Sequence, residues 1–360
     1  MIRVLHIVTY MGRGGLETML MNYYRNIDRT KVQFDFLVHR EVEADYDKEI
    51  LDMGGKIYHV SRLIPWSKEY KNELKRFLKE HPEYKIVHVH QDCLSSVALK
   101  CAEECGIPVR IAHSHSSSAV KNIKYPIKRY YMKDIPKYAT HLFACGEQAG
   151  KWMFSGLDFN IVKNAIDIDK YKYSEDKDKN LRAKYDLENK FIIGHVGRFR
   201  KEKNQEFIID IFNNVSKKVD NAILMLVGDG EEQQRIEEKV KQLNLQDKVM
   251  FMGARSDVND LMQMMNVFLF PSLYEGLGIV LIEAQASGLP CVVSSTIPEE
   301  AILDKKNISI IMLEDSIDIW VNNIAKYSET SRKNNCHLLR KAGYDIKYAA
   351  KWLEEFYVSK

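Results

Sequence analysis

The chain has 360 residues, enough for two domains of ordinary size, each with its own core. Its 45% hydrophobic and 29% charged residues are typical of a soluble globular protein, and no apolar run reaches the roughly 18–20 residues of a membrane span. Residues 1–165 hold 25 Lys and Arg against 19 Asp and Glu, a balance of +6. At this size such a balance does not indicate nucleic acid binding, but it fits a weak attraction to anionic lipid.

The first residues pass directly into a strand pattern and lack the long apolar core of a signal peptide. The six cysteines form no C-x2-C pair and show no metal-ligand spacing. We therefore expect reduced thiols in a cytoplasmic protein.

The first predicted element is a buried parallel strand over residues 2–8, followed by a glycine-containing loop and a helix over 18–26. This order opens a doubly wound α/β unit. The loop does not match the dinucleotide fingerprint, because Glu17 stands where the third glycine is needed. The sequence therefore argues against an NAD site.

Further strands are predicted at 33–39, 56–60 and 86–90, with helices between them, including one over 69–80. Strands that alternate with helices predict a parallel sheet with helices on both faces. His88 and His90 could bind a metal, but no carboxylate pair accompanies them. Hydrogen bonds at the strand end are the more usual role of such residues.

A polar cluster, His113-Ser114-His115-Ser116, follows the next predicted strand, over 107–112. The carboxyl ends of parallel strands are where α/β sheets bind ligands. Either histidine could therefore face a ligand.

A basic amphipathic stretch covers residues 120–137 and is interrupted by Pro126. Such a stretch can lie on a membrane surface, and it can equally be the solvated face of a helix. The sequence leaves both readings open. Its cations are Lys121, Lys124, Lys128, Arg129, Lys133 and Lys137.

The second half repeats the alternation of strand and helix. A highly charged stretch over 174–190 indicates surface after a domain boundary. Strands are predicted at 191–196, 222–227, 248–252 and 291–294, and helices at 205–217, 231–243 and 258–265. A last helix over 347–357 has one apolar face, formed by Ala349, Trp352, Leu353 and Phe356.

Residues 268–290 predict a short strand, a turn and then a helix that ends at a Gly-Leu-Pro stop. Glu275 lies in the turn and Glu283 lies inside the helix. Between them Gly276, Leu277 and Gly278 leave backbone N–H groups open at a helix N-terminus, which favours an anion. A phosphate with a carboxylate on either side fits a nucleotide-sugar.

This spacing resembles the E-x7-E motif of GT-B glycosyltransferases, in particular the retaining enzymes of family 4 (group 1 type). The resemblance covers nearly the whole chain, and its motifs occur in the family's order. Ala165 and Asn204 stand where the family usually has glycine. The other matching segments are Gly14-Gly15-x-Glu17, HSSSAVKN from His115, Asn164–Asp167 and Gly197–Asn204.

The resemblance implies an α/β GT-B fold, with two Rossmann-like, doubly wound parallel-sheet domains facing a central cleft. Residues 1–165 would bind the acceptor, and residues 345–360 would pack back on that domain. Residues 166–344 would bind the donor.

The resemblance also implies site roles. Arg198 and Lys203, with the amides of Gly276, Leu277 and Gly278, would bind the diphosphate. Glu275 would bind sugar hydroxyls, Glu283 the ribose, and Arg255 would lie near the base. Gly14 and Gly15 would approach the donor phosphate, and His115 would touch the transferred sugar, with His113 as the alternative.

The implied activity moves a hexose or N-acetylhexosamine from a UDP-sugar to a hydroxyl of a lipid-linked saccharide, with retention, in bacterial exopolysaccharide or capsule synthesis. No cofactor or metal is expected, because the two Asp-x-Asp patterns, at 167–169 and 176–178, lie at or after the hinge. A sugar-nucleotide epimerase and a non-catalytic partner subunit are the alternatives. The E-x7-E motif argues against the first, and the retained motif residues argue against the second.

Overall fold

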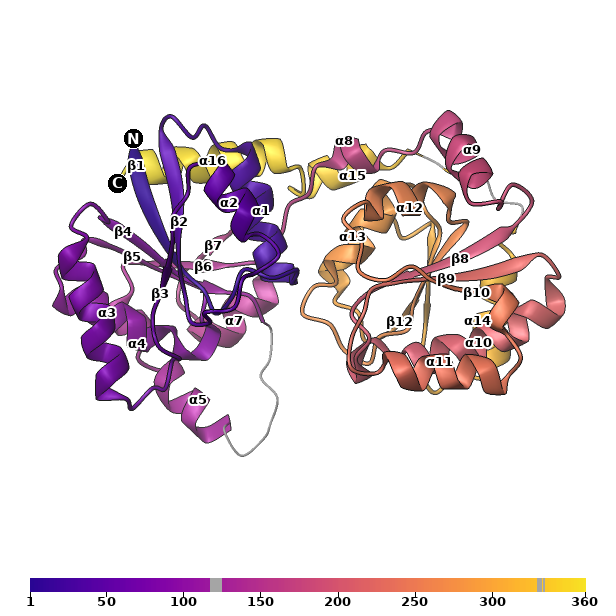
Figure 1. Cartoon of the computed structure of the whole chain (residues 1–360), viewed down its shortest axis with the longest axis horizontal. Coiled ribbons are helices and arrows are strands. Elements are labelled where there is room, and N and C mark those ends of the chain that lie inside the picture. Colours follow the sequence, from indigo (N-terminus) through magenta and orange to yellow (C-terminus); the bar gives the residue numbers. More distant parts are fainter. Residues whose placement is uncertain (117–124, 329–331, 333) are drawn as a thin grey trace. The chain divides into compact units, whose positions relative to one another are not determined.

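The chain divides into two compact units in a computed structural model that describes residues 1–116, 125–328, 332 and 334–360 (Figure 1). The N-terminal unit comprises Met1–Ile166 and Gly343–Lys360, and the C-terminal unit comprises Asp167–Ala342. The boundaries expected from the sequence, after residues 165 and 344, lie within two residues of these.

The N-terminal unit is built on a seven-stranded sheet with the order β3-β2-β1-β4-β5-β6-β7. Every neighbouring pair is parallel, and β1 registers Val4 against both Phe34 of β2 and Ile86 of β4. Apolar runs form the central strands because helices cover both faces. The strands are β1 (Ile2–Ile7), β2 (Val32–Val38), β3 (Ile57–His59), β4 (Ile86–Val89), β5 (Val109–Ser114), β6 (His141–Ala144) and β7 (Asn160–Ile161).

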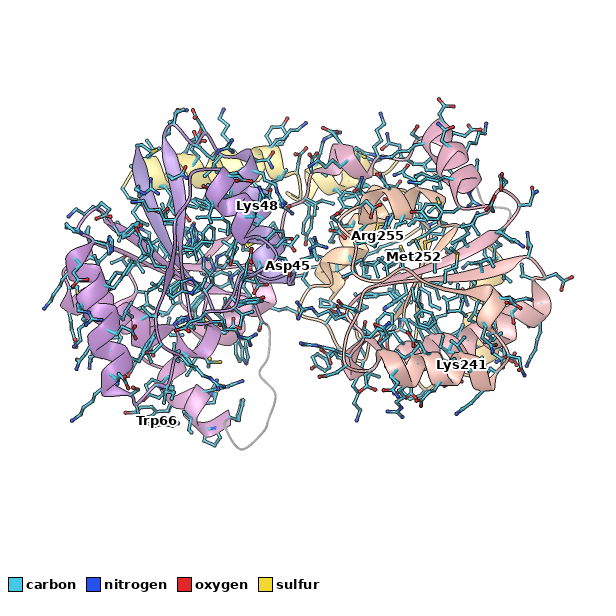
Figure 2. All side chains as sticks on the ribbon, in the orientation of Figure 1. Asp45, Lys48, Trp66, Lys241, Met252 and Arg255 are labelled. Carbon is cyan, nitrogen blue, oxygen red and sulfur yellow. The ribbon has the colours of Figure 1, made fainter. Side chains whose placement is uncertain are left out.

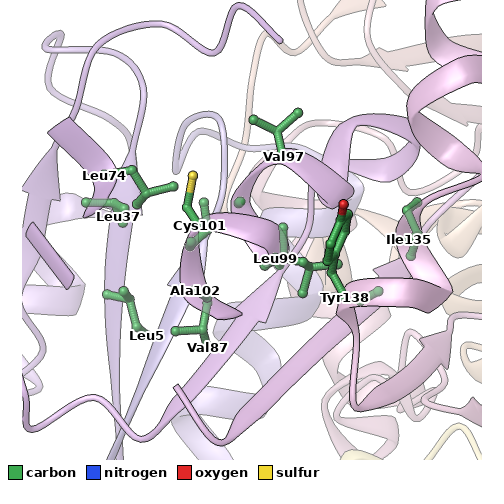
Figure 3. Close-up of a cluster of buried hydrophobic side chains, with 14 of the residues drawn as sticks. Leu5, Leu37, Leu74, Val87, Val97, Leu99, Cys101, Ala102, Ile135 and Tyr138 are labelled. Atoms are coloured by element: carbon green, nitrogen blue, oxygen red, sulfur yellow. The ribbon is translucent and has the colours of Figure 1, made fainter. Parts of the chain in front are cut away.

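Two hydrophobic clusters fill the two faces of this sheet. On one face, Leu99 and Ala102 of α4 pack in one cluster with Val87 and Leu5 of the sheet (Figure 3). That face is covered by α3 (Lys68–Glu80), α4 (Ser95–Glu104), α5 (Tyr125–Met132), α6 (Ile135–Tyr138) and α7 (Glu147–Phe154), and a 3-10 turn, η1 (Asp92–Leu94), precedes α4. The other is covered by α1 (Gly15–Asn26), α2 (Asp47–Asp52) and α16 (Ile346–Val358).

The last helix, α16, lies against α1 in the N-terminal unit (Figure 1). The predicted apolar face was wrong in part, because Trp352 is 41% exposed. The buried face runs one residue further round the helix, through Ile346, Ala350, Leu353 and Tyr357. Residues at this spacing share one face of a helix.

The C-terminal unit has a six-stranded sheet with the order β10-β9-β8-β11-β12-β13, again parallel throughout. Its strands are β8 (Phe191–Val196), β9 (Ala222–Val227), β10 (Val249–Phe251), β11 (Val267–Phe270), β12 (Cys291–Ser294) and β13 (Ile308–Ile311). Its helices are α8 (Ile168–Tyr171), α9 (Glu175–Lys184), α10 (Gln205–Lys218), α11 (Gln233–Gln242), α12 (Val258–Met264), α13 (Ile279–Ala286), α14 (Ile317–Ala325) and α15 (Cys336–Lys341). Three 3-10 turns, η2 (Lys201–Lys203), η3 (Gln246–Lys248) and η4 (Glu299–Ala301), lie between them. The predicted α/β class with two parallel sheets is confirmed.

None of the helices within the described ranges is long and apolar enough to cross a membrane. In the basic stretch, residues 120–124 lie outside the described residues. The rest forms two short helices, α5 and α6, rather than one. Pro126 does not interrupt α5, because it lies in the first turn, where no intrahelical N–H bond is lost.

Two loops of the C-terminal unit meet backbone to backbone. The N–H of Phe199 donates to the carbonyl of Asp229 at 2.6 Å, and a Cβ on Gly228 would overlap the carbonyl oxygen of Gly197. Gly228 also has a φ of +133°, which side chains rarely adopt. The loops after β8 and β9 can therefore approach only because position 228 is glycine.

We expect Gly228→Ala to destabilise the C-terminal unit by clearly more than Gly253→Ala. Both glycines have a positive φ, but a Cβ at Gly253 would meet no atom within 4 Å. The control should therefore lose only about 1–2 kcal/mol from backbone strain. Calorimetry of the two variants measures the difference, and equal losses would contradict the close approach.

Candidate functional site

The candidate site in the C-terminal unit is formed by the loops that follow β8 and β11. These strands are neighbours, so their carboxyl ends deliver both loops to one edge of the sheet. The N–H of Leu273 donates to the carbonyl of Glu202 at 2.8 Å. The side-chain amide of Asn204 donates to the carbonyl of Pro271 at 3.1 Å. The two loops thus hold each other in place.

Asn204, which stands where the resembled family usually has glycine, keeps the backbone shape that glycine would allow. Its φ is +59° and its ψ is +38°, in the left-handed region. Asn enters this region more readily than most residues. The substitution also adds the bond to Pro271. The departure from the motif is therefore compatible with the loop.

An ion pair joins two of the predicted site residues. Lys203 Nζ donates to Glu275 Oε1 at 2.6 Å, and the two side chains are 20% and 8% exposed. The ammonium also lies 5.5 Å from the ring centre of Phe270, within cation–π range. The pair therefore fixes a positive charge and a carboxylate directly before α13.

The turn between this ion pair and α13 contains backbone N–H groups that can donate hydrogen bonds to a ligand. Gly278 caps the helix with a φ of +78°, and a Cβ there would lie 3.2 Å from the ring of Phe270. Within the described part of the chain, the N–H groups of Gly276, Leu277 and Gly278 donate no hydrogen bond. Buried Leu277 anchors the turn. Free amides and the positive end of α13 together favour an anion.

Glu283 lies in the second turn of α13 and is partly buried. Burial raises the pKa of its carboxyl to about 7, and a hydrogen bond with Tyr171 acts in the opposite direction. A carboxyl with this pKa is charged in only part of the molecules near neutral pH. It can accept hydrogen bonds from hydroxyl groups as a carboxylate.

The two predicted arginines have different surroundings. Arg198 is exposed in the loop after β8, and its carbonyl accepts from Gln205 Nε2 at 2.9 Å. Arg255 follows β10, two strands away, and is labelled in Figure 2. It forms a two-point ion pair with Asp257, at 2.8 and 2.6 Å, which raises the pKa of the guanidinium. Arg255 thus pairs with a neighbour in its own loop, and Arg198 belongs to the loop after β8 that also carries Lys203.

Five histidines of the N-terminal unit form two buried hydrogen-bonded chains. His90 connects His6, at 3.0 Å, to His115, at 2.9 Å. His88 connects His113, at 3.1 Å, to the hydroxyl of Tyr357, at 2.7 Å. The hydrogen bonds expected for His88 and His90 are therefore present.

The two chains separate the two candidate histidines. His113 is fully buried, whereas His115 follows β5 and is partly exposed. Each has one buried ring nitrogen without a partner in the described residues, Nε2 of His113 and Nδ1 of His115. Asp92 holds this loop through the N–H of His115, at 3.1 Å, and the hydroxyl of Ser116, at 3.2 Å. The geometry favours His115 as the one that can meet a ligand. The motif's remaining residues, 117–122, lie outside the described residues.

Burial keeps all five histidines neutral. It lowers the pKa of His6 and of His115 to about 3, and it lowers the pKa values of His88, His90 and His113 well below the ordinary 6.5. Two sets of three have ring nitrogens within 4.8 Å of one another, as a metal site would require: His6, His88 and His90, and His90, His113 and His115. The rings of His113 and His115 are stacked with their centroids 4.1 Å apart, and ring nitrogens of both residues are used in hydrogen bonds to His88 and His90.

Gly14 and Gly15 begin α1 at the carboxyl edge of the N-terminal sheet. A Cβ on Gly14 would overlap the carboxylate of Glu17, whereas one on Gly15 would meet nothing within 4 Å. Local packing against Glu17 therefore favours glycine at position 14, whereas the space beside Gly15 is open.

Three residues that position the site were missed by the sequence reading. They are Tyr171, beside Glu283; Asp92, beside His115; and Ser272, whose carbonyl accepts from Ser294 and Thr296 at 2.7 Å each. Tertiary contacts bring Tyr171 to Glu283 and Asp92 to His115, and Ser272, although it precedes Glu275 by three residues, shows its role only through the bonds from Ser294 and Thr296.

Comparison with known proteins identifies the family. The glycosyl transferases group 1 model matches residues 177–345. A protein of Bacillus subtilis (strain 168) named glycosyltransferase EpsF is 34% identical over 356 residues, which cover 95% of this chain and 93% of the relative. The chain belongs to the group 1 glycosyltransferases.

A second relative and a solved structure are also similar to this chain. An Escherichia coli relative, named UDP-Gal:alpha-D-GlcNAc-diphosphoundecaprenol alpha-1,3-galactosyltransferase, is 22% identical over 307 residues, 79% of this chain and 78% of its own. The solved structure of Anabaena Alr3699/HepE in complex with UDP matches with a TM-score of 0.82 at 17% identity, over 100% of both chains. The fold of this group 1 glycosyltransferase is thus of the predicted GT-B type.

We expect an NMR titration of a 13C-labelled Glu283 carboxyl to give a pKa near 7, and Tyr171→Phe to raise it. The unfolded chain releases this proton near pH 4.5, so the free energy of unfolding should fall as the pH rises from about 4.5 to about 7. The fall is at most about 3 kcal/mol. Glu283→Gln assigns the signal and should remove the fall. A pKa near 4.5 would contradict the burial argument.

The histidine chains predict the opposite slope for the N-terminal unit. Because the unfolded chain takes up protons near pH 6.5 and the fold does not, stability is lost as the pH falls from about 6.5 towards about 3. His6→Gln should reduce this slope by about 1.4 kcal/mol per pH unit. Exposed His59→Gln, which lies outside both histidine chains, is the control variant. Calorimetry between pH 5 and 7 measures both.

Proposed function

We propose that this group 1 glycosyltransferase moves a hexose or N-acetylhexosamine from a UDP-sugar to a hydroxyl of a lipid-linked saccharide, with retention and without a metal. The product is a bacterial surface polysaccharide such as an exopolysaccharide or capsule. Residues 166–344 bind the donor and residues 1–165 bind the acceptor.

The observation that carries the proposal is the Lys203–Glu275 ion pair beside three open amides. At 2.6 Å the pair holds a cation and a carboxylate before α13. The cation and the amides of Gly276–Gly278 suit a diphosphate, and the carboxylate suits sugar hydroxyls. A diphosphate attached to a sugar satisfies both at once.

The reaction breaks the bond between the anomeric carbon and the diphosphate oxygen. Negative charge then develops on the leaving nucleoside diphosphate. Arg198, Lys203 and the open amides are placed to stabilise that charge, which is the task a metal performs in other enzymes. The acceptor hydroxyl forms the new bond on the face that the diphosphate leaves, its proton passing to the leaving oxygen. Glu283 binds the ribose, Arg255 lies by the base, and His115 touches the sugar.

Donor and acceptor are supported by the comparisons. The E. coli relative's name states a UDP-sugar donor and a diphosphoundecaprenol-linked acceptor, and HepE was solved with UDP. Peripheral contact with the membrane follows from such an acceptor. The described part of 120–137 offers Lys128, Arg129, Lys133 and Lys137 beside exposed Tyr130. Anionic lipid attracts such a surface.

We expect UDP at a hundred times its Kd to stabilise the protein by about 2.7 kcal/mol, a shift of a few degrees, with GDP, ADP and NAD as comparisons. Arg198→Gln and Lys203→Gln should each weaken UDP binding by roughly 10–100-fold, since each removes a charged hydrogen bond worth about 1.5–3 kcal/mol. Arg200→Gln, in the same loop, is the control and should bind UDP normally. Isothermal titration measures these affinities.

Product analysis separates the alternatives. A UDP-sugar that returns as its epimer would replace the proposal with an epimerase, and a protein that binds no nucleotide would indicate a partner subunit. If only GDP or ADP raised the Tm, the proposed donor would change to a sugar linked to that nucleotide, and the proposed reaction class would stay the same.

A further inference from the structure

A pocket of about 610 Å³ opens in the N-terminal unit and is lined by residues of that unit alone. Its wall is formed by the loops after β1, β2, β3 and β4 together with the start of α1. The strand order places the switch point of this sheet between β1 and β4. Open α/β sheets bind their ligands at that point, outside the carboxyl ends of the strands.

Two arginines give the pocket a positive wall. Arg40 follows β2 and Arg62 follows β3, and both are exposed. Arg40 lies over the ring of Tyr10 at 5.3 Å, a contact that orients the guanidinium without neutralising it. Among the described residues, no carboxylate forms an ion pair with either arginine. Planar guanidinium groups match phosphate and carboxylate oxygens in two-point contacts.

The floor of the pocket is polar and ordered. His39 Nδ1 donates to the carbonyl of Val8 at 2.7 Å, so neutral His39 must accept at Nε2, where Tyr70 and Gln91 approach at 3.0 and 3.1 Å. Gln91 therefore donates with its nitrogen. Its buried Oε1 has no hydrogen-bond partner in the described part of the chain. A buried orphan acceptor is costly and calls for a donor such as a ligand hydroxyl.

The pocket is joined directly to the His115 loop. His90 and Asp92 both line it. His90 binds the ring of His115 at 2.9 Å, and Asp92 binds the N–H of His115 at 3.1 Å. A molecule in this pocket thus lies beside the residues that hold the histidine assigned to the transferred sugar.

We propose that this pocket binds the acceptor, and that Arg40 and Arg62 bind an anionic group on it while Gln91 accepts from a sugar hydroxyl. The inference rests on the proposed function, because only a sugar transfer gives the pocket an acceptor to bind. The anionic group is either a phosphate that links the saccharide to its carrier or the carboxylate of an acidic sugar. A neutral acceptor would leave both guanidinium groups without a partner in the pocket.

The test is isothermal titration of the full chain with inorganic pyrophosphate and, separately, with D-glucuronate. Arg198→Gln and Lys203→Gln are combined in the background, so that anion binding at the donor site is weakened. In this background Arg40→Gln with Arg62→Gln should weaken binding of at least one probe by tenfold or more. Because both arginines are exposed, circular dichroism of the variant should match the parent.

Lys85→Gln is the matched control, since exposed Lys85 precedes β4 and lies at the other edge of the same sheet. It should leave binding unchanged. Pyrophosphate binding that needs the arginines identifies a phosphate source, and glucuronate binding that needs them identifies an acidic sugar. Binding of neither probe, or an affinity for both probes that is unchanged by loss of both arginines, overturns the inference. UDP binding by the native chain tests the proposed function separately, so the two failures are distinguishable.

Discussion

The parallel pairing of β8 with β11 is the constraint on which the candidate donor site depends. It registers Ile193 with Val267 and brings the carboxyl ends of two strands, distant in sequence, to one edge. Their loops then exchange bonds between Leu273 and Glu202 and between Asn204 and Pro271. Only within this frame can Lys203 and Glu275 approach to 2.6 Å. The chemistry of the site is therefore a consequence of strand order.

In both units, burial favours the neutral form of ionisable groups. In the N-terminal unit, histidines bind one another as neutral rings and lose protons to burial. In the C-terminal unit, burial raises the pKa of the Glu283 carboxyl, so this group keeps its proton to a higher pH. Both effects come from the same cost of placing charge away from water. Their consequence is that the buried histidines reduce stability towards acid, whereas buried Glu283 reduces it towards neutral pH.

Sequence patterns located the elements best where burial is simple. The central strands are continuous apolar runs, and β8, β9 and β12 begin and end where the pattern predicts. Prediction failed where one element has mixed neighbours. The face of α16 was displaced by one residue because several of its aromatic residues are apolar but only some are covered. Strand β13 and helices α9 and α14 carry weak or mixed patterns and were not predicted.

The sequence by itself determined the family, the fold class and the spacing of Glu275 and Glu283 on a turn and a helix, because these depend on local order along the chain. Tertiary structure alone decided which loops meet, since the sequence of one segment does not determine which other strand it pairs with. It alone showed the histidine chains, the burial of Glu283 beside Tyr171 and the need for glycine at 228. Each of these depends on atoms tens to hundreds of residues apart that only packing brings into contact.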